Sequence, residues 1–522
     1  MPEPENCVAL KANVVFLVWN GVDSAREFGL EHRLEMVTMA DVGGAQPLER
    51  KCGPMMTENQ RDSMSFGFQM LSDSQLADIH HASLEILRRT GVRVHDTEAR
   101  DLLGDAGCLV SGNLVKFPAA VIEKAVSHAP SRIVLCSNTG EPRVHLEGQR
   151  TFFGTGSDLP NTLDLETGER RPSCLSDVRD TARLADFLPN IDFVMSMALP
   201  SDLAPQTSDR HSFLAMITNT AKPVVFTAWD ESGLADIITM AETVAGGADA
   251  LTLNPFLLAY LEPTSPLQHS QVVLRKMLMM ADRRLPIVYA PGGVDGASVP
   301  VTAAGSLALA NAEVLSGLTI AQLRQPGTPV VYGSGNGPLD MRTTVAAYSS
   351  PEFMRHCKAM AELGQRFYHL PTWGFSGCSD AKLPDIQAGV DSSLWFLWTA
   401  LSGANLVHDI GYLESGMTCS YEMIVICDEI IGFVRRLLGG IELSQETLAL
   451  EVIDEVGPGG DHLSTEHTLR HFKECWYPSL FDRFSYQSWT EAGRPGAIAK
   501  ARQAARDAIA NHRPKPLPDA TL

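Results

Sequence analysis

The chain has 522 residues, of which 44% are hydrophobic and 20% charged, so a large folded core is readily built. Its formal net charge of −20 argues against nucleic acid and anionic membranes as partners and suits an enzyme of small molecules. The ten cysteines are spread without a CxxC pair, as is typical of a reducing cytoplasm. No apolar run approaches 18 residues, so no transmembrane helix is predicted. We therefore expect a cytoplasmic protein.

The first part of the chain changes character near residue 57. Residues 1–56 differ in pattern from the rest, and we expect a disordered or atypical extension there. A helix is predicted over residues 72–91, with Ser72 as its N-cap and Gly91 as its stop. Short strands and helices follow, so residues 57–148 are predicted to form an N-terminal α/β subdomain.

From about residue 150, short apolar strands alternate with helices. The eight predicted strands are 151–158, 191–200, 222–229, 256–263, 285–293, 328–336, 369–377 and 404–411. The helices are expected within 175–188, 210–220, 233–246, 270–283, 303–324, 351–367, 385–403 and 423–440. Strands that are apolar throughout are typical of a parallel sheet covered by helices on both faces. Eight such units predict a (β/α)8 TIM barrel over residues 149–440, and an open doubly wound sheet is the alternative.

Residues 441–522 are predicted to form a C-terminal helical segment. Its first part could pack on the barrel or on another subunit. An Ala- and Arg-rich stretch over 495–512 predicts an amphipathic surface helix, after which the chain is expected to fray.

Aromatic residues recur where the predicted strands end, which is where a barrel binds its ligands. The five residues at equivalent places are Trp229, Tyr260, Tyr289, Tyr332 and Trp373. Phe375 shares a strand face with Trp373, because side chains alternate along a strand. A ring of aromatic side chains binds a quaternary ammonium group by cation–π attraction. The alternative is that aromatic residues occur here because they favour strands.

Polar residues occupy the same predicted rim. Glu262 would complement a cation inside an aromatic cup, and His408 with Asp409 follows the eighth strand. Asp158 and Asn336 follow two other strands. A structural ion pair remains open for Glu262, and a core histidine for His408. No HExxH motif or His/Cys cluster with metal spacing occurs, so no metal site is predicted.

A flexible polar loop, GFSGCSDAKLPDIQAG (residues 374–389), follows the seventh strand. Its glycines permit close backbone approach to a ligand, and Asp380 and Lys382 are expected to face the substrate or a protein partner. Asp385 and Gln387 could instead cap and open the next helix. A lone Cys378 with no evident base is expected to be a bystander.

Three stretches resemble the trimethylamine methyltransferase superfamily. They are GCSDAKLPDIQAGVDS, GANLVHDIGYLESGMTCSYEMIVICDEIIGF and LEPTSPLQHS, and the resemblance covers roughly residues 70–510. It implies a TIM barrel that moves a methyl group from a methylamine or quaternary amine to Co(I) of a separate corrinoid protein. The corrinoid is then bound by the partner and not by this chain, for which no cofactor-binding residue is assigned. A homo-oligomer is also expected.

The archaeal trimethylamine enzymes of that superfamily carry pyrrolysine, and this sequence contains none. A quaternary amine needs no such activation, because its methyl group leaves behind a neutral amine. The resemblance therefore implies the non-pyrrolysine branch and a betaine-type substrate, with Glu262, Asp380 and His408 as catalytic candidates. The substrate-binding candidates are Trp229, Tyr260, Tyr289, Tyr332, Asn336, Trp373, Phe375 and Lys382. A betaine carboxylate could be held by Lys382, Asn336, His269 or Arg342.

Four alternatives remain open at this point. The chain could demethylate trimethylamine, or it could bind betaines without methyl transfer. An unrelated barrel acting on a phosphorylated substrate would need a phosphate nest after strands seven and eight, which only GFSG offers. A purely structural protein is disfavoured by the polar groups at the strand ends.

Overall fold

The computed structural model describes residues 68–517, and the predicted extension over 1–56 lies outside them. The first described helix, α4 (Asp73–Arg89), confirms its predicted caps. The Ser72 side chain accepts a hydrogen bond from the backbone N–H of Gln75, and Gly91 follows the helix with φ 76°.

The N-terminal α/β region packs against the central part of the chain. It comprises β1 (Val92–Val94), α5 (Thr97–Asp105), β2 (Leu109–Ser111), β3 (Leu114–Lys116), α6 (Ala119–His128), β4 (Ile133–Cys136) and β5 (Pro142–Leu146). β4 and β5 pair with each other, and β1, β2 and β3 form one sheet with β11 (Gln268–His269) in the order β11-β1-β3-β2. The β1–β11 pair ties this region to the loop that follows β10 (Leu257–Leu261).

Two parallel sheets form the centre of the fold. The first has the order β14-β12-β10-β9 and the second β17-β18-β6, and every ladder in them is parallel. Besides β10, the strands are β6 (Phe152–Thr155), β9 (Val224–Phe226), β12 (Ile287–Tyr289), β14 (Val330–Tyr332), β17 (Trp373–Phe375) and β18 (Leu406–Ile410). All but one of their residues are buried, as expected for strands covered on both faces.

The strand predicted over 191–200 is not a regular strand. Phe193 and Val194 make only single parallel bridges, to Gly154 of β6 and Val224 of β9. The Thr155 side chain takes part in the pairing, since its Oγ1 accepts from the backbone N–H of Met195 at 2.7 Å. Met197 then turns the backbone to φ 56°. Side-chain bonding and this left-handed residue prevent a continuous ladder.

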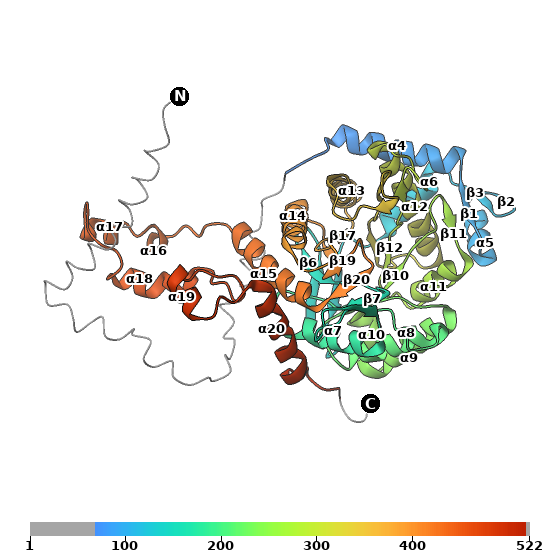
Figure 1. Ribbon diagram of the computed structural model, residues 1–522. Helices are drawn as coiled ribbons and strands as arrows, with labels where there is room; N and C mark the ends of the chain where they lie inside the picture. Colours follow the sequence, from blue (N-terminus) through green and yellow to red (C-terminus); the bar gives the residue numbers. More distant parts are fainter. Residues whose placement is uncertain (1–67, 518–522) are drawn as a thin grey trace, which may run out of the picture. The chain divides into compact units, whose positions relative to one another are not determined.

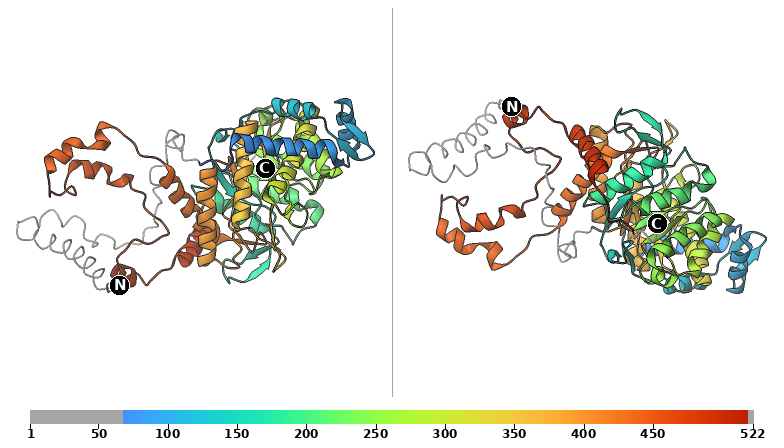
Figure 2. Two further views of the ribbon diagram at one scale, coloured as in Figure 1. Left: turned by 90° about the horizontal axis from the view of Figure 1, so that it is seen from above. Right: turned by 90° about the horizontal axis from the view of Figure 1, so that it is seen from below.

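Helices surround the strands of the two parallel sheets in Figure 1, and Figure 2 shows the same elements from above and from below. The helices are α7 (Leu175–Phe187), α8 (Pro205–Ile217), α9 (Glu231–Ala245), α10 (Ala248–Leu253), α11 (Gln271–Asp282), α12 (Ala303–Arg324), α13 (Pro351–Glu362), the π-helical η3 (Leu363–Tyr368), α14 (Ile386–Ser402) and α15 (Tyr421–Leu438). Of these, α12 is long and apolar enough to cross a membrane, but most of it is buried in the protein, as in a core helix.

Smaller sheets connect these elements. One has the order β19-β20-β7-β8, from β7 (Asn161–Leu163), β8 (Arg170–Pro172), β19 (Tyr412–Leu413) and β20 (Thr418–Ser420). The other contains β13 (Val294–Asp295), β15 (Gly337–Asp340) and β16 (Val345–Ala346).

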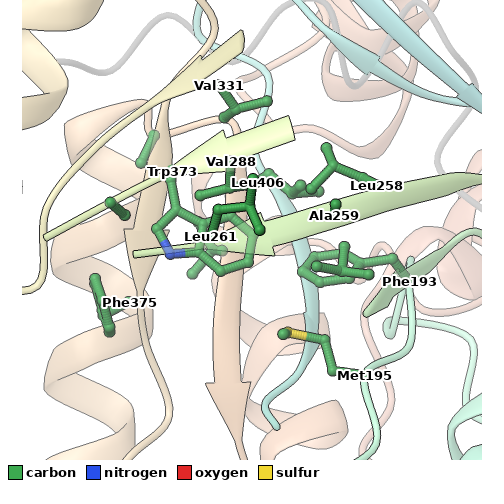
Figure 3. Close-up of a cluster of buried hydrophobic side chains, with 14 of the residues drawn as sticks. Phe193, Met195, Leu258, Ala259, Leu261, Val288, Val331, Trp373, Phe375 and Leu406 are labelled. Carbon is green, nitrogen blue, oxygen red and sulfur yellow. The ribbon is translucent and has the colours of Figure 1, made fainter. Parts of the chain in front are cut away.

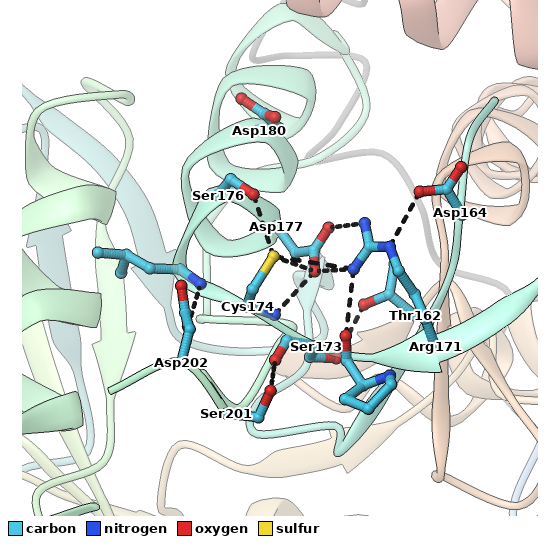
Figure 4. Close-up of polar contacts among 12 residues, drawn as sticks. Thr162, Asp164, Arg171, Ser173, Cys174, Ser176, Asp177, Asp180, Ser201 and Asp202 are labelled. Carbon is cyan, nitrogen blue, oxygen red and sulfur yellow. Dashed lines mark hydrogen bonds and ion pairs between the residues drawn. The ribbon is translucent and has the colours of Figure 1, made fainter. Parts of the chain in front are cut away.

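A buried carboxylate joins the first of these small sheets to α7 (Figure 4). Asp177 receives two hydrogen bonds from the Arg171 guanidinium, at 2.8 and 2.9 Å, and one from the Tyr421 hydroxyl at 2.8 Å. Burial alone would raise the pKa of Asp177, but these donors lower it below its usual range. The ion pair with Arg171 therefore fixes the start of α7 against β8, and the hydrogen bond from Tyr421 fixes it against α15.

The C-terminal segment contains α16 (Gln445–Leu448), α17 (Leu450–Val456), α18 (Glu466–His471), η4 (Phe472–Glu474), α19 (Tyr486–Glu491) and α20 (Ala497–Asn511). The amphipathic helix predicted over 495–512 corresponds to α20, which packs on α15. The Glu429 carboxylate of α15 accepts backbone hydrogen bonds from Ser479 and Leu480.

The mixed α/β class with C-terminal helices is confirmed. The domain boundaries predicted at 56, 148 and 440 stay predictions.

Candidate active site

Side chains from both parallel sheets meet around Trp373 (Figure 3). The register explains which residues share this face. Tyr260 pairs with Val288, and Phe375 pairs with His408 on the adjacent strand. Because side chains alternate along a strand, Trp373 and Phe375 lie on one face of β17.

The result is a compact aromatic cluster. The ring centroid of Trp373 lies 5.3 Å from that of Tyr260 and 4.2 Å from that of His408. The ring centroids of Phe375 and His408 are 4.4 Å apart. Trp373 and Phe375 are almost fully buried, while Tyr260 keeps some accessible surface. We call Tyr260, Trp373, Phe375 and His408 the aromatic cluster.

Three carboxyl groups adjoin the aromatic cluster. The Tyr260 hydroxyl donates a hydrogen bond to Glu262, which follows β10. Asp409 lies next to His408 on β18, with its Oδ1 2.5 Å from His408 Nδ1. Asp158, after β6, accepts hydrogen bonds from the hydroxyls of Ser196 and Thr227 at 2.9 and 2.8 Å. Negative charge and aromatic faces are thus available at one place.

Burial and neighbouring charges raise the pKa of two of these acids, Glu262 and Asp158. Burial is the largest cause that raises the pKa of Glu262, and the charges of Asp409 and Asp158 raise it further, against the Tyr260 hydrogen bond and His408. Burial likewise raises the pKa of Asp158. The side chain of Glu262 is nevertheless exposed at the surface, so solvent reaches its carboxyl group. A bound cation would favour the ionised forms of Glu262 and Asp158.

Two buried polar atoms in the cluster lack a hydrogen bond within residues 68–517. They are Nε1 of Trp373 and Nδ1 of His408. The His408 nitrogen is within ion-pair distance of Asp409, but the two atoms do not have hydrogen-bond geometry. Unpaired buried polar atoms are costly, and each calls for an explanation such as a catalytic role or a bound water or ion.

Comparisons with known proteins place this chain in a family. The trimethylamine methyltransferase (MTTB) family model matches residues 48–522. The trimethylamine methyltransferase of Methanosarcina thermophila is 35% identical over 468 residues, covering 86% of this chain and 94% of that protein. This chain belongs to the trimethylamine methyltransferase family.

Other relatives carry different substrate names. A Desulfitobacterium hafniense trimethylamine methyltransferase is 32% identical over 456 residues, covering 87% of this chain and 92% of that protein. A glycine betaine methyltransferase from another strain of that species is 30% identical over 427 residues, covering 81% and 89%. The crystal structure of the Methanosarcina barkeri monomethylamine methyltransferase matches with a TM-score of 0.47 and 11% identity over 88% of this chain and 92% of that one. The predicted family and the methyltransferase activity are confirmed.

Two of the predicted aromatic residues of this methyltransferase point away from the cluster. Tyr289 pairs with Leu261 and with Tyr332, so both tyrosines lie on the opposite strand face from Tyr260. The Tyr289 hydroxyl lies 2.5 Å from Nδ1 of His269, whose Nε2 lies 2.8 Å from the Ser316 hydroxyl. The prediction that all five strand-end aromatics form one ring is therefore wrong.

Tyr332 and His269 are part of the packing between strands and helices. The Tyr332 hydroxyl donates to Asn311 of α12 at 2.7 Å. Burial lowers the pKa of His269 to about 3, so its imidazole is neutral and cannot hold a carboxylate as a cation.

Trp229 and Asn336 also lie outside the cluster. Trp229 is 56% exposed after the end of β9, and its backbone N–H donates to Asp209. Asn336 is fully buried and bonded within the protein: it accepts from the Gly293 N–H at 2.7 Å and donates to the Ser306 hydroxyl at 3.1 Å. A satisfied amide has little capacity left for a ligand.

The loop after β17 is fixed in place mainly by hydrogen bonds to the carboxylate of Asp380. Asp380 accepts from the backbone N–H groups of Tyr348 and Ser349 and from the Ser415 hydroxyl, which indicates a bracing role. Lys382 is exposed and donates to the backbone carbonyl of Asp380. The alternative prediction that Asp385 caps the next helix is confirmed, because its side chain caps α14.

Two further candidates have no role at the cluster. Arg342 is exposed and paired with Asp340 at 3.2 Å. Cys378 is fully buried, and burial raises the pKa of its thiol well above the usual range. A thiol that resists ionisation is a poor nucleophile, in agreement with the expectation of a bystander.

Sequence reasoning missed two tyrosines near the acids. Tyr348 precedes α13, and the charges of Asp409 and Glu262 contribute to raising its pKa. Tyr412 opens β19, and its hydroxyl donates to the Ser157 carbonyl beside Asp158 at 2.6 Å. Both come from segments between main elements, and only the position of Tyr412 four residues after His408 offered a signal.

Proposed function

We propose that this methyltransferase transfers a methyl group from a quaternary amine to the Co(I) of a separate corrinoid protein. The observation that carries the proposal is the aromatic cluster of Tyr260, Trp373, Phe375 and His408 with carboxyl groups beside it. Aromatic faces attract an ammonium group by roughly 0.5–2 kcal/mol each. Carboxylates add charge complementarity to the ammonium group.

The reaction is a direct displacement. The corrinoid supplies the Co(I) nucleophile. The methyl carbon leaves the nitrogen and bonds to cobalt, while the C–N electron pair stays on the departing neutral amine, so no proton has to be supplied. Trp373 and Phe375 would orient the ammonium group, and Glu262 and Asp409 would balance its charge. The protein therefore contributes mainly positioning and exclusion of water.

We also propose that the central strands form the (β/α)8 barrel expected of such an enzyme. Single parallel bridges support closure between the two sheets. β6 is bridged to Phe193, Val194 is bridged to β9, and Tyr332 of β14 is bridged to Thr372 beside β17. The eight segments would then follow one another around a ring in chain order, with the aromatic cluster inside it.

The sequence contains no pyrrolysine, and this favours a quaternary amine as the substrate over a tertiary amine. A tertiary amine must first be made cationic before it can lose a methyl group. The second candidate substrate is trimethylamine itself, and the 32–35% identity to trimethylamine methyltransferases favours it. The four residues proposed for a betaine carboxylate, Lys382, Asn336, His269 and Arg342, have other partners. The cationic end of the substrate is thus the part that the cluster would recognise.

The reducing cytoplasm suits this chemistry, since Co(I) is readily oxidised and the eight described cysteines are all free. A homo-oligomer is proposed as well, because many large apolar side chains of residues 441–486 are exposed.

The test is spectroscopic. The purified protein is mixed with a corrinoid protein in the Co(I) state and offered trimethylamine, glycine betaine, proline betaine, carnitine, choline or tetramethylammonium. Absorbance follows the methylation of cobalt. We expect methylation with at least one quaternary amine and none with trimethylamine. Methylation with trimethylamine alone would establish the second candidate, and binding of a quaternary amine without methylation by any of them would overturn the proposed transfer.

A further inference from the structure

Two histidines and a glutamate meet in the C-terminal segment, far along the chain from the aromatic cluster. His467 and His471 are four residues apart and share one face of α18, with ring centroids 4.4 Å apart. Glu446 comes from α16, and its Oε1 lies 3.1 Å from Nε2 of His471. One side-chain ligand atom from each of the three lies within 4.8 Å of the others.

A second carboxylate orients one of the imidazoles. Oε1 of Glu474 lies 2.6 Å from Nδ1 of His471. Histidines that bind metals commonly donate their other ring N–H to a carboxylate, which fixes the tautomer and makes the free nitrogen a better ligand. His471 is therefore oriented with Nε2 towards Glu446 and His467.

The helices that carry these residues have no hydrophobic core of their own. In α16, α17 and α18, all within the described part of the chain, no residue is buried. Large apolar side chains such as Leu450 and Leu463 are 69% and 81% exposed. Small units that cannot bury apolar surface usually depend on a disulfide, a metal or association for their stability. The cysteine closest along the chain, Cys475, is free.

We propose that Glu446, His467 and His471 bind one divalent transition-metal ion of the zinc class, which joins α16 to α18. Two imidazoles and one carboxylate are a ligand set that suits Zn²⁺. Bonds of about 2.0–2.2 Å in a tetrahedral site set ligand atoms about 3.3–3.5 Å apart. Side-chain rotations that close the present spacing of up to 4.8 Å would form the site.

Arg470 would compete with a metal ion for the carboxylate of Glu446. Its Nη2 lies 3.0 Å from the Oε1 of Glu446 that would bind the ion. The guanidinium must leave that oxygen when a metal enters, so the proposal predicts opposite effects for two neighbouring residues. Loss of His471 should abolish binding, whereas loss of the Arg470 charge should strengthen it.

The experiment uses the full chain, freed of metal with a chelator that is then removed. Zn²⁺ is titrated by calorimetry, and Co²⁺ is titrated while its visible absorption reports tetrahedral coordination. We expect one tight site per chain in the wild type, and its loss in His467→Ala and His471→Ala. Glu474→Gln should weaken binding about 10-fold or more. Arg470→Ala should bind more tightly than the wild type.

His462→Ala is the matched control, because His462 is exposed on the same segment and lies outside the cluster. Hydrogen exchange supplies a second measurement in the unaltered protein. Zn²⁺ should slow exchange in residues 441–475 of the wild type and of His462→Ala, but not of His467→Ala. Equal zinc affinity in all variants, or binding that leaves exchange unchanged, would overturn the proposal. Neither readout depends on methyl transfer.

Discussion

Replacing Glu313 with glutamine should remove a pH dependence from the stability of this methyltransferase. Glu313 is fully buried on α12 and accepts hydrogen bonds from the Leu267 N–H at 2.6 Å and the Ser265 hydroxyl at 2.8 Å. It thereby anchors the loop that directly follows Glu262. Burial raises the pKa of Glu313 from 4.5 to about 7, against the smaller effect of these two donors.

The direction of the pH dependence follows from the number of protons that the native and unfolded states bind. Between pH 4.5 and about 7 the native protein holds a proton on Glu313 that the unfolded chain has released. The corresponding stability is fully present below pH 4.5 and is lost as the pH rises through about 7. The difference between the two pKa values corresponds to about 3 kcal/mol of unfolding free energy. Roughly 2.5 kcal/mol of this is lost as the pH rises from about 5 to about 8. For a protein of this size the change in Tm is about 2–3 °C.

Thermal unfolding of the wild type, Glu313→Gln and the exposed-site control Glu451→Gln tests this between pH 5 and pH 8. The Tm of the wild type should fall by about 2–3 °C relative to that of Glu313→Gln as the pH rises, because glutamine carries no titrating proton. The control should follow the wild type. Parallel curves for wild type and Glu313→Gln would refute the reasoning, since Glu313 would then keep one protonation state over this range.

Three further substitutions test the site and its support. Tyr260→Phe removes a hydroxyl that donates to a carboxylate, so calorimetry should show about 10-fold weaker binding of tetramethylammonium or more, and no change for the exposed Tyr486→Phe. Asn405→Ala removes one hydrogen bond to the buried Thr372 N–H and two to the part-buried carbonyls of Gly148 and Arg150, and should lower the unfolding free energy by about 2 kcal/mol or more; an unchanged Tm would contradict this. Gly317→Ala places a methyl group 2.1 Å from an aromatic ring of β12 and should destabilise by about 1–3 kcal/mol. Gly389→Ala, which meets open space, should not.

The sequence predicted where most central strands lie, because their apolar runs are bounded by glycine and proline. It did not predict which way their last residues point. Tyr289 and Tyr332 end their strands much as Tyr260 does, yet a one-residue difference in register puts them on the opposite face. Chain position alone cannot reveal this offset, because it is set by pairing between strands.

The sequence also did not predict which residues, distant along the chain, lie close together in the fold. Asp385 was predicted as a cap because capping is local. Glu446 and His471 are 25 residues apart on separate helices, and no short motif links them. Tyr348 similarly reaches the acids from a connecting segment, where periodicity carries no information.

The alternation along the central strands separates the residues that hold the scaffold from those that would meet a ligand. Tyr332 is tied to Asn311 and Tyr289 to His269, so exchanges there break hydrogen bonds between strands and helices. Trp373 and Phe375 are held by packing, and neither side chain depends on a hydrogen bond to keep its place. The side chains of the aromatic cluster can therefore change by single exchanges while the surrounding framework stays intact. Such an arrangement lets one framework adapt to amines of different size during evolution.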